Sequence, residues 1–194
     1  MKWSNKLKLS DLSDLSYNFD LNYLNSESPG WYHDRYCERI DISKIASTAT
    51  APIIIKRIKE YLKNYKFPDP KLVRSYFDPN SNMEGRNMLI EGKFLWVKVY
   101  FPVRISEVID TRDSFGYSYR TLEGHWEKGQ ISFFINAINK YAVEIKIESV
   151  SQPAHIERWD YRIGFKLFGR YLQRKFAKSC IKRIKSRINS IAKH

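Results

Sequence analysis

The sequence predicts an α+β domain in which an antiparallel β-meander packs against one long C-terminal amphipathic helix. Between about residues 72 and 150 the apolar residues alternate with a period of two, as they do in half-buried strands. After residue 155 they recur every four positions, as they do along one face of a helix. Short strands joined by short turns favour an antiparallel meander, and the apolar face of the helix can then cover one side of the sheet.

The composition suits one domain with one core. The chain has 194 residues, of which 43% are hydrophobic and 15% aromatic. No apolar run approaches the ~18 residues of a membrane-spanning helix, and the N-terminal segment lacks the apolar stretch of a secretory signal. Residues 1–28 are rich in Asn, Ser and Asp and are predicted to form a polar arm, which leaves residues 29–194 as the domain.

The two cysteines, Cys37 and Cys180, lie far apart in the sequence and fit no metal-ligand spacing. We interpret them as free thiols in a reducing compartment. The sequence therefore predicts a cytoplasmic protein, and a peripheral association with a membrane stays open.

A first helix is predicted over residues 50–66. Thr48 or Thr50 can cap its N-terminus, and Pro52 suits its first turn. One face is apolar at spacings of three and four, through Ile54, Ile55, Ile58, Tyr61, Leu62 and Tyr65. The FPDPK segment that follows ends the helix, because proline lacks the backbone N–H that another turn would need.

Strands are predicted over residues 94–109, 115–121, 130–138 and 141–149. Pro102 interrupts the first of these strands and is expected to cause a break or to lie at an edge position. The second strand places Phe115, Tyr117 and Tyr119 on one face. The third is apolar on both faces, as in a central strand.

The C-terminal helix carries an apolar stripe and a basic stripe on opposite sides. Apolar residues recur every four positions from Phe168 to Ile188, and seven Lys/Arg recur in the same way from Arg158 to Lys182, offset by two. An offset of two is about 200° around a helix. A curved sheet closed over such a helix is the helix-grip arrangement of the START and birch-pollen-allergen proteins. An ordinary α+β sandwich is the alternative.

Four segments of the chain carry a family resemblance. FGYSYRTLEGHWEKGQISF resembles the segment GFAYGTLPGHPERGEERF, which is typical of the uncharacterised family DUF1990. PGWYHD, SQPAH and QRKFAK resemble other segments of that family in the same order, so the resemblance covers roughly residues 29–186. The matching positions are Gly30, Trp31, Asp34, Gly116, Tyr119, Thr121, Leu122, Gly124, His125, Gly129, Phe133, Ser151, Pro153, Ala154, His155, Gln173, Arg174, Phe176 and Ala177.

This sequence departs from the DUF1990 pattern at four positions. Arg120 and Glu123 replace a glycine and a proline, and Gln130 and Ile131 replace two glutamates. Any chemistry that depended on those two acidic residues would be missing here. The resemblance implies no reaction, because the family has no established activity.

The first functional hypothesis is a binding module that holds a hydrophobic or amphipathic small ligand between sheet and C-terminal helix. Aromatic rings with hydroxyl groups would supply both apolar contact and hydrogen bonds. The predicted ligand-binding residues are Phe115, Tyr117, Tyr119, Arg120, His125 and Phe133. Arg120 would meet an acidic head group if it turned inward. The alternative is that the same rings fill a dry core.

The second hypothesis is an interaction module whose basic helix binds an anionic membrane surface or nucleic acid. Residues 151–194 hold 12 Lys/Arg and two acidic residues, so most of the net charge of +13 lies in this segment. The predicted contacts are Arg162, Lys166, Arg170, Arg174, Lys178 and Lys182. Aromatics are scarce on the basic face, which favours lipid over nucleic acid. The alternative is a solvated helix face.

The third hypothesis is an enzyme that uses His125 with Glu123 or Glu127, since a carboxylate can orient a histidine as a general base. A hairpin loop is the favoured interpretation of this EGHWEKG segment, because Gly124 and Gly129 permit a tight reversal. The four histidines show no metal-ligand spacing, and the sequence contains no phosphate-binding glycine loop. No metal and no cofactor are predicted.

Overall fold

Seven antiparallel strands and two main helices make up the computed structural model, which describes residues 9–20, 22, 29–45, 49–94, 97–156 and 159–193. The strands are β1 (Tyr32–Asp41), β2 (Val73–Tyr76), β3 (Asn87–Phe94), β4 (Val97–Asp110), β5 (Ser114–Thr121), β6 (Glu127–Asn139) and β7 (Ala142–Pro153). The helices are η1 (Leu9–Leu12), η3 (Ile42–Lys44), α1 (Ala51–Lys63) and α2 (Trp159–Ala192). The predicted α+β class, with a meander and a long C-terminal helix, is confirmed.

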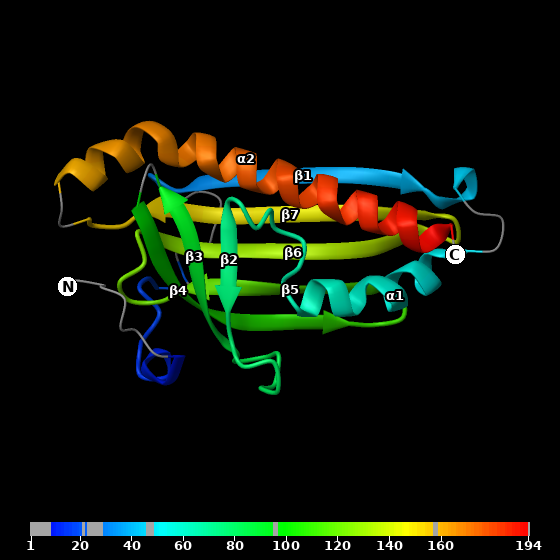
Figure 1. The fold of residues 1–194 in the computed structure, drawn as a ribbon, viewed down its shortest axis with the longest axis horizontal. Helices are drawn as coiled ribbons and strands as arrows, with labels where there is room; N and C mark the ends of the chain where they lie inside the picture. The colour runs from blue at the N-terminus through cyan, green and yellow to red at the C-terminus, as the bar shows by residue number, and fades with distance from the viewer. Residues whose placement is uncertain are drawn as a thin grey trace.

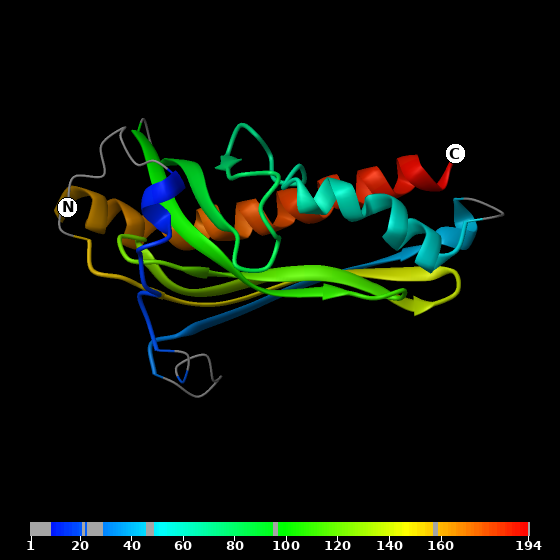
Figure 2. The ribbon, with the colours of Figure 1, turned by 90° about the horizontal axis from the view of Figure 1, so that it is seen from below.

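The strands form one sheet in the order β1-β7-β6-β5-β4-β3-β2. From β2 to β7 each strand pairs with the next along the chain, whereas β1 pairs with β7 at the far edge. Figure 1 shows α1 and α2 in front of the sheet, with α2 running roughly along β1 and β7, and Figure 2 shows that both helices lie on the side toward which β3 and β4 curl. That concave face is therefore the one that the helices cover.

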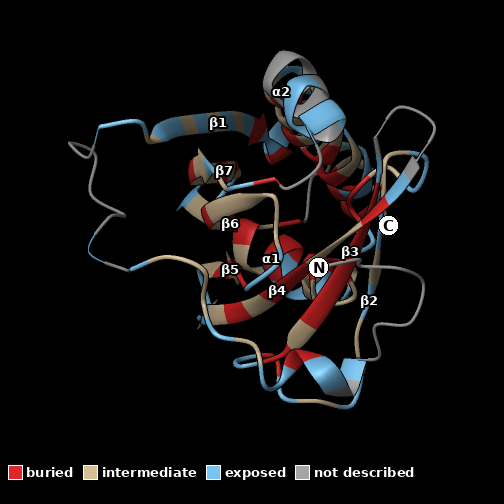
Figure 3. Cartoon of the chain, turned by 90° about the vertical axis from the view of Figure 1, so that its left-hand side faces the viewer, coloured by how far each residue is buried: buried red, intermediate tan, exposed pale blue. Residues whose placement is uncertain are grey.

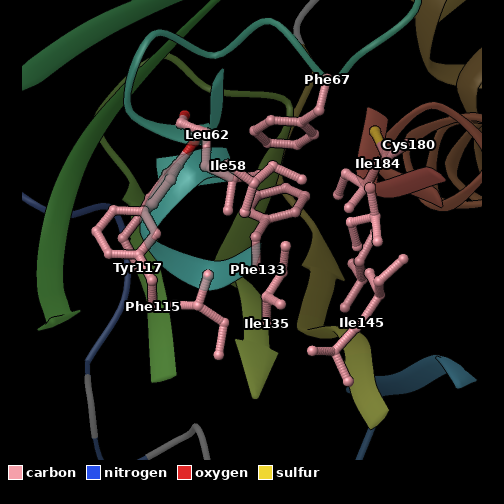
Figure 4. Packing of buried hydrophobic residues seen from close by; sticks show 14 of the residues in the cluster. Ile58, Leu62, Phe67, Phe115, Tyr117, Phe133, Ile135, Ile145, Cys180 and Ile184 are labelled. Atoms are coloured by element: carbon pink, nitrogen blue, oxygen red, sulfur yellow. Dashed lines mark hydrogen bonds between the residues drawn. The ribbon is translucent and has the colours of Figure 1, made fainter. Parts of the chain in front are cut away.

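The core lies between the concave face and the two helices. Phe115, Tyr117 and Phe133 are at most 1% exposed. In the part of the chain that the structure describes, five aromatic rings surround Phe133, with centroid distances from 4.8 to 6.4 Å: those of Tyr65, Phe67, Tyr117, Tyr119 and Phe176. Figure 4 shows the Phe133 ring between the sheet and the side chains of α1 and α2. This end of the concave face is filled.

Both predicted helices form as their periodicity indicates. In α1, Ile54, Ile58 and Leu62 are buried, and Pro52 lies in the first turn. In α2, Cys180, Ile184 and Ile188 are buried at the predicted spacing of four. The helix is unbroken over 34 residues, about 50 Å. No described helix has an apolar stretch long enough to cross a bilayer.

Pro102 does not break its strand. It lies inside β4, paired with Leu89 of β3 on one side. On its other side its carbonyl accepts the backbone N–H of Leu122, one residue beyond the end of β5. The backbone N–H that proline lacks would point toward β5 just where the pairing of β4 with β5 ends. Pro102 therefore lies at a local edge of the sheet, where the lost hydrogen bond costs little.

Part of the predicted N-terminal arm packs against the sheet. Leu12 is fully buried, and the Arg104 guanidinium donates to the carbonyl oxygens of Leu12, Ser13 and Leu15 at 2.9 to 3.1 Å. Tyr17 forms an isolated bridge with Leu122. Residues 1–8, 21 and 23–28 of the arm lie outside the described part of the chain.

Candidate ligand cavity

A cavity of about 210 Å³ lies between the concave face and the N-terminal half of α2, and it is partly open to solvent. Its walls come from strands β1 to β7, from the loop between β5 and β6, from α2 and from the segment between α1 and β2. Most of the lining is apolar, through Ile90, Phe101, Val103, Ile131, Ile147, Leu172, Phe176 and Ala177. The cavity continues the filled core toward the N-terminal end of α2.

A chain of polar side chains crosses one wall of the cavity. The Arg170 guanidinium donates two hydrogen bonds to the Asp34 carboxylate, at 2.6 and 2.8 Å, and a third to Gln173 Oε1 at 2.9 Å. Because Gln173 Oε1 is held by Arg170, its amide Nε2 points the other way and donates to Glu127 Oε1. Three elements, β1, α2 and β6, thus meet at one polar network.

Glu127 is the group in this network whose ionisation the fold changes most. Burial raises the pKa of its carboxyl to about 7, and the neighbouring Asp34 charge acts in the same direction. The positive charge of Arg170 and the hydrogen bond from Gln173 oppose that rise in pKa. Near neutral pH the carboxyl is therefore partly protonated, so it can either donate a hydrogen bond or accept one.

His125 lies in the loop between β5 and β6, which confirms the predicted hairpin. Its backbone N–H donates to the Leu122 carbonyl at 3.1 Å, and its ring Nδ1 accepts the backbone N–H of Glu127 at 2.9 Å. Burial lowers the pKa of His125 to about 3, so the ring is neutral and carries its proton on Nε2. Glu123 is exposed. The Nδ1 atom is thus occupied by a backbone group rather than by either carboxylate.

Thr121 and Gly129 hold the two ends of this hairpin together. The Gly129 N–H donates to Thr121 Oγ1 at 2.9 Å, and that hydroxyl lies 2.6 Å from the Asn18 side-chain oxygen. Gly129 has a φ of 144°, and a Cβ there would lie 2.0 Å from the Val150 carbonyl oxygen. Only glycine fits at this position, because the backbone of β7 passes too close for a side chain.

The structure divides the six predicted ligand-binding residues among three places. Tyr119 and His125 line the cavity. Phe115, Tyr117 and Phe133 belong to the filled core instead, as the alternative interpretation expected. Arg120 lies outside both.

Arg120 belongs to the opposite face of the sheet. Its guanidinium donates to Gln130 Oε1 at 2.8 Å and lies 5.7 Å from the centroid of the Tyr17 ring. It does not turn inward, because successive side chains of a strand point to opposite faces and Tyr119 and Thr121 take the inner one.

The predicted anion-binding residues do not form one uniform stripe. Arg162, Arg174, Lys178 and Lys182 are exposed, whereas Arg170 turns toward Asp34. The side chain of Lys166 lies outside the described residues. Cys37 and Cys180 are both free thiols, and no group of three metal-ligating side chains occurs in the part of the chain that the structure describes.

Sequence reasoning did not single out Asp34 or Gln173 as site residues. Asp34 faces α2 from β1, and Gln173 faces the sheet from α2. The inward positions of both elements are partly polar, so hydrophobic periodicity could not identify these two residues. The family resemblance was a signal that could have found them. Asp34 lies in PGWYHD and Gln173 in QRKFAK, two of the segments that carry it.

We expect Asp34→Asn to lower the free energy of unfolding by about 1–3 kcal/mol, because it removes one partner of a half-buried, bidentate ion pair. Urea unfolding of Asp34→Asn, Arg170→Gln and the double variant measures the coupling directly. A coupling energy near zero would contradict a structural role for this pair.

Known proteins share this fold at very low sequence identity. Norcoclaurine synthase from Thalictrum flavum, solved as a point mutant with a transition-state analogue, matches with a TM-score of 0.55 and 9% identity over 81% of this chain and 94% of that one. A START superfamily protein from Mycobacterium smegmatis matches with a TM-score of 0.51 and 9% identity over 82% and 98%. The fold is thus the START-like helix-grip arrangement.

The sequence matches name a family and no activity. A UPF0548 protein of Dictyostelium discoideum is 31% identical over 138 residues, which cover 64% of this chain and 62% of that relative. The match therefore spans less than two thirds of the relative's length. The family described as "Domain of unknown function (DUF1990)" matches residues 22–183, and the chain belongs to that family.

Proposed function

We propose that this protein binds a small amphipathic molecule in the cavity between its sheet and α2. The observation that carries the proposal is that segments far apart in the sequence meet there. All four segments that carry the family resemblance contribute to the lining, through Asp34, Tyr119, Thr121, His125, Glu127, Lys128, Gly129, Ser151, Gln173, Phe176 and Ala177. A core that served only for packing would not need a polar network at its end. Burying polar groups costs free energy of folding unless each group finds a hydrogen-bond partner.

The lining supports a ligand with one apolar part and one polar group. Aliphatic and aromatic side chains surround most of the space, and Glu127, with its pKa near 7, lies at one side. A partly protonated carboxyl accepts a hydrogen bond from a hydroxyl or an amine and donates one to a carbonyl. The cavity volume of about 210 Å³ is below the ~300–1,000 Å³ of typical ligand pockets, so the enclosed part of the ligand is small.

The fold comparison supports the same kind of site. The norcoclaurine synthase that shares this architecture was solved with a transition-state analogue. At 9% identity the likeness extends to the fold and not to the reaction. The proposal for this chain therefore names a binding site and no catalysed step.

Filling the cavity tests the proposal. We expect Leu172→Trp, on the inner side of α2, to weaken binding of the dye anilinonaphthalene sulfonate by about tenfold or more, because the indole occupies the space that the dye would take. Dye fluorescence titration measures the affinity, and native mass spectrometry of the same preparations reports any molecule that is retained on purification.

Lys175→Trp is the matched control, because it adds the same side chain at an exposed position one turn away. It should bind the dye as the unmodified protein does. Thermal unfolding checks that both variants are folded. Equal dye affinity in a folded Leu172→Trp variant would overturn the proposal.

A further inference from the structure

The N-terminal half of α2 carries large apolar side chains that nothing in the described part of the chain covers. Trp159, Ile163 and Tyr171 are 68%, 51% and 62% exposed. At about 100° per residue, Ile163 and Tyr171 lie about 40° and 120° around the helix from Trp159. This apolar row therefore winds around about a third of the helix circumference along about 18 Å of its length. Trp159 and Ile163 lie at the end of α2 that projects past the strand ends in Figure 1 and faces the viewer in Figure 3.

Exposed cations accompany this row. The sequence of α2 holds ten Lys/Arg and one acidic residue, Asp160. Some of these cations are engaged toward the body of the protein: Arg170 pairs with Asp34, and Lys185 pairs with Glu38. Arg162 and Arg174 are exposed in the same half of the helix as the apolar row, and Lys178 is exposed just beyond the midpoint.

We propose that this end of α2 docks on the surface of an anionic lipid bilayer. We call its six residues the docking face: Trp159, Arg162, Ile163, Tyr171, Arg174 and Lys178. Indole and phenol rings settle at the boundary between headgroups and acyl chains, and Ile163 adds apolar area at the same depth. Arg and Lys pair with lipid phosphates while their methylene stems stay in the apolar layer.

The chemistry of the docking face fits lipid better than nucleic acid. A phosphate backbone would use the cations and could stack bases on the rings, but it offers no environment for an exposed isoleucine. A lipid surface uses all three kinds of side chain. The inner side of the same helical turns, at Gly169, Leu172 and Gln173, lines the cavity. Docking would therefore place the cavity wall that α2 forms next to the membrane surface.

Vesicle sedimentation tests the docking face in the full-length protein. We expect binding to phosphatidylcholine vesicles that contain phosphatidylserine, and a steep loss of binding as salt rises, because screening weakens the charge attraction. Changing Trp159, Ile163 and Tyr171 together to serine should weaken binding by about tenfold or more. Reversing Arg162, Arg174 and Lys178 to glutamate should do the same.

Matched variants keep the test specific. Ile53, Ile138 and Tyr141 are 40%, 43% and 42% exposed elsewhere on the protein, and changing these three to serine should leave binding unchanged. Unchanged binding in the Trp159, Ile163 and Tyr171 variant would overturn the proposal. So would equal binding to vesicles of phosphatidylcholine alone, or binding to RNA without binding to vesicles.

The docking test is separate from the test of the cavity. Leu172→Trp changes the inner side of α2 and leaves the docking face intact, so it should bind vesicles normally even where it fails to bind the dye. Loss of vesicle binding in Leu172→Trp, in a folded protein, would contradict a docking face confined to those six residues.

Discussion

Phe133→Ala is expected to lower the free energy of unfolding by about 3–5 kcal/mol. The Phe133 ring is 1% exposed and lies at the centre of the aromatic cluster, where rings from the sheet, α2 and the segment after α1 meet. Truncation would remove the largest shared contact of these elements and leave a cavity that rigid neighbouring rings cannot refill. Urea unfolding followed by tryptophan fluorescence measures the change.

Phe134→Ala is the matched control, because it removes the same ring from the next residue of β6 on the opposite face. Phe134 is only half-buried, and its neighbours include the Lys146 ammonium group, 5.6 Å from the ring centroid. We expect a cost of about 1 kcal/mol for this substitution. Equal losses of stability in the two variants would contradict the assignment of the core to the concave face.

Glu127→Gln is expected to stabilise the protein by about 3 kcal/mol near pH 8 and to have little effect near pH 4.5. Burial raises the pKa of the Glu127 carboxyl from 4.5 to about 7 in the folded protein. Between these values the folded state keeps the proton that the unfolded chain has lost. The stability of the unmodified protein therefore falls as pH rises from about 4.5 through 7.

Glutamine removes this penalty, because it cannot ionise and its side-chain oxygen can still accept the hydrogen bond from Gln173. Urea unfolding across this pH range gives the difference between variant and unmodified protein at each pH. Glu123→Gln, at the exposed carboxyl of the same loop, should change stability by less than about 0.5 kcal/mol throughout. A difference for Glu127→Gln that does not grow with pH would show that the carboxyl stays hydrated.

The ionisation of Glu127 should also make binding of the proposed ligand depend on pH, because this carboxyl lines the cavity. A cationic amine would bind more tightly as pH rises through the pKa of Glu127, because the carboxylate form attracts it. A ligand that accepts a hydrogen bond from the protonated carboxyl would bind less tightly over the same range. The sign of the pH dependence of dye displacement therefore separates these two ligand classes.

Strands whose inward residues are apolar could be read from the sequence, and strands whose inward residues are polar could not. The alternation in residues 141–149 predicts β7, with Val143, Ile145 and Ile147 buried. β1 shows no such alternation, because Asp34 and Glu38 occupy inward positions. Those carboxylates are satisfied by Arg170 and Lys185, which lie more than a hundred residues further along the chain.

The sequence by itself determined both main helices, the strands β4 to β7 and the family, since each depends on local periodicity or on matching segments. Only the tertiary structure decided where the concave face is filled and where it is hollow. Tyr117 and Tyr119 have the same pattern in β5, yet the Tyr117 hydroxyl reaches the Leu62 carbonyl under α1, while Tyr119 borders the cavity beneath α2. The physical reason is that alternation assigns a residue to a face of the sheet, whereas the helices that pack on that face determine how much space remains above it.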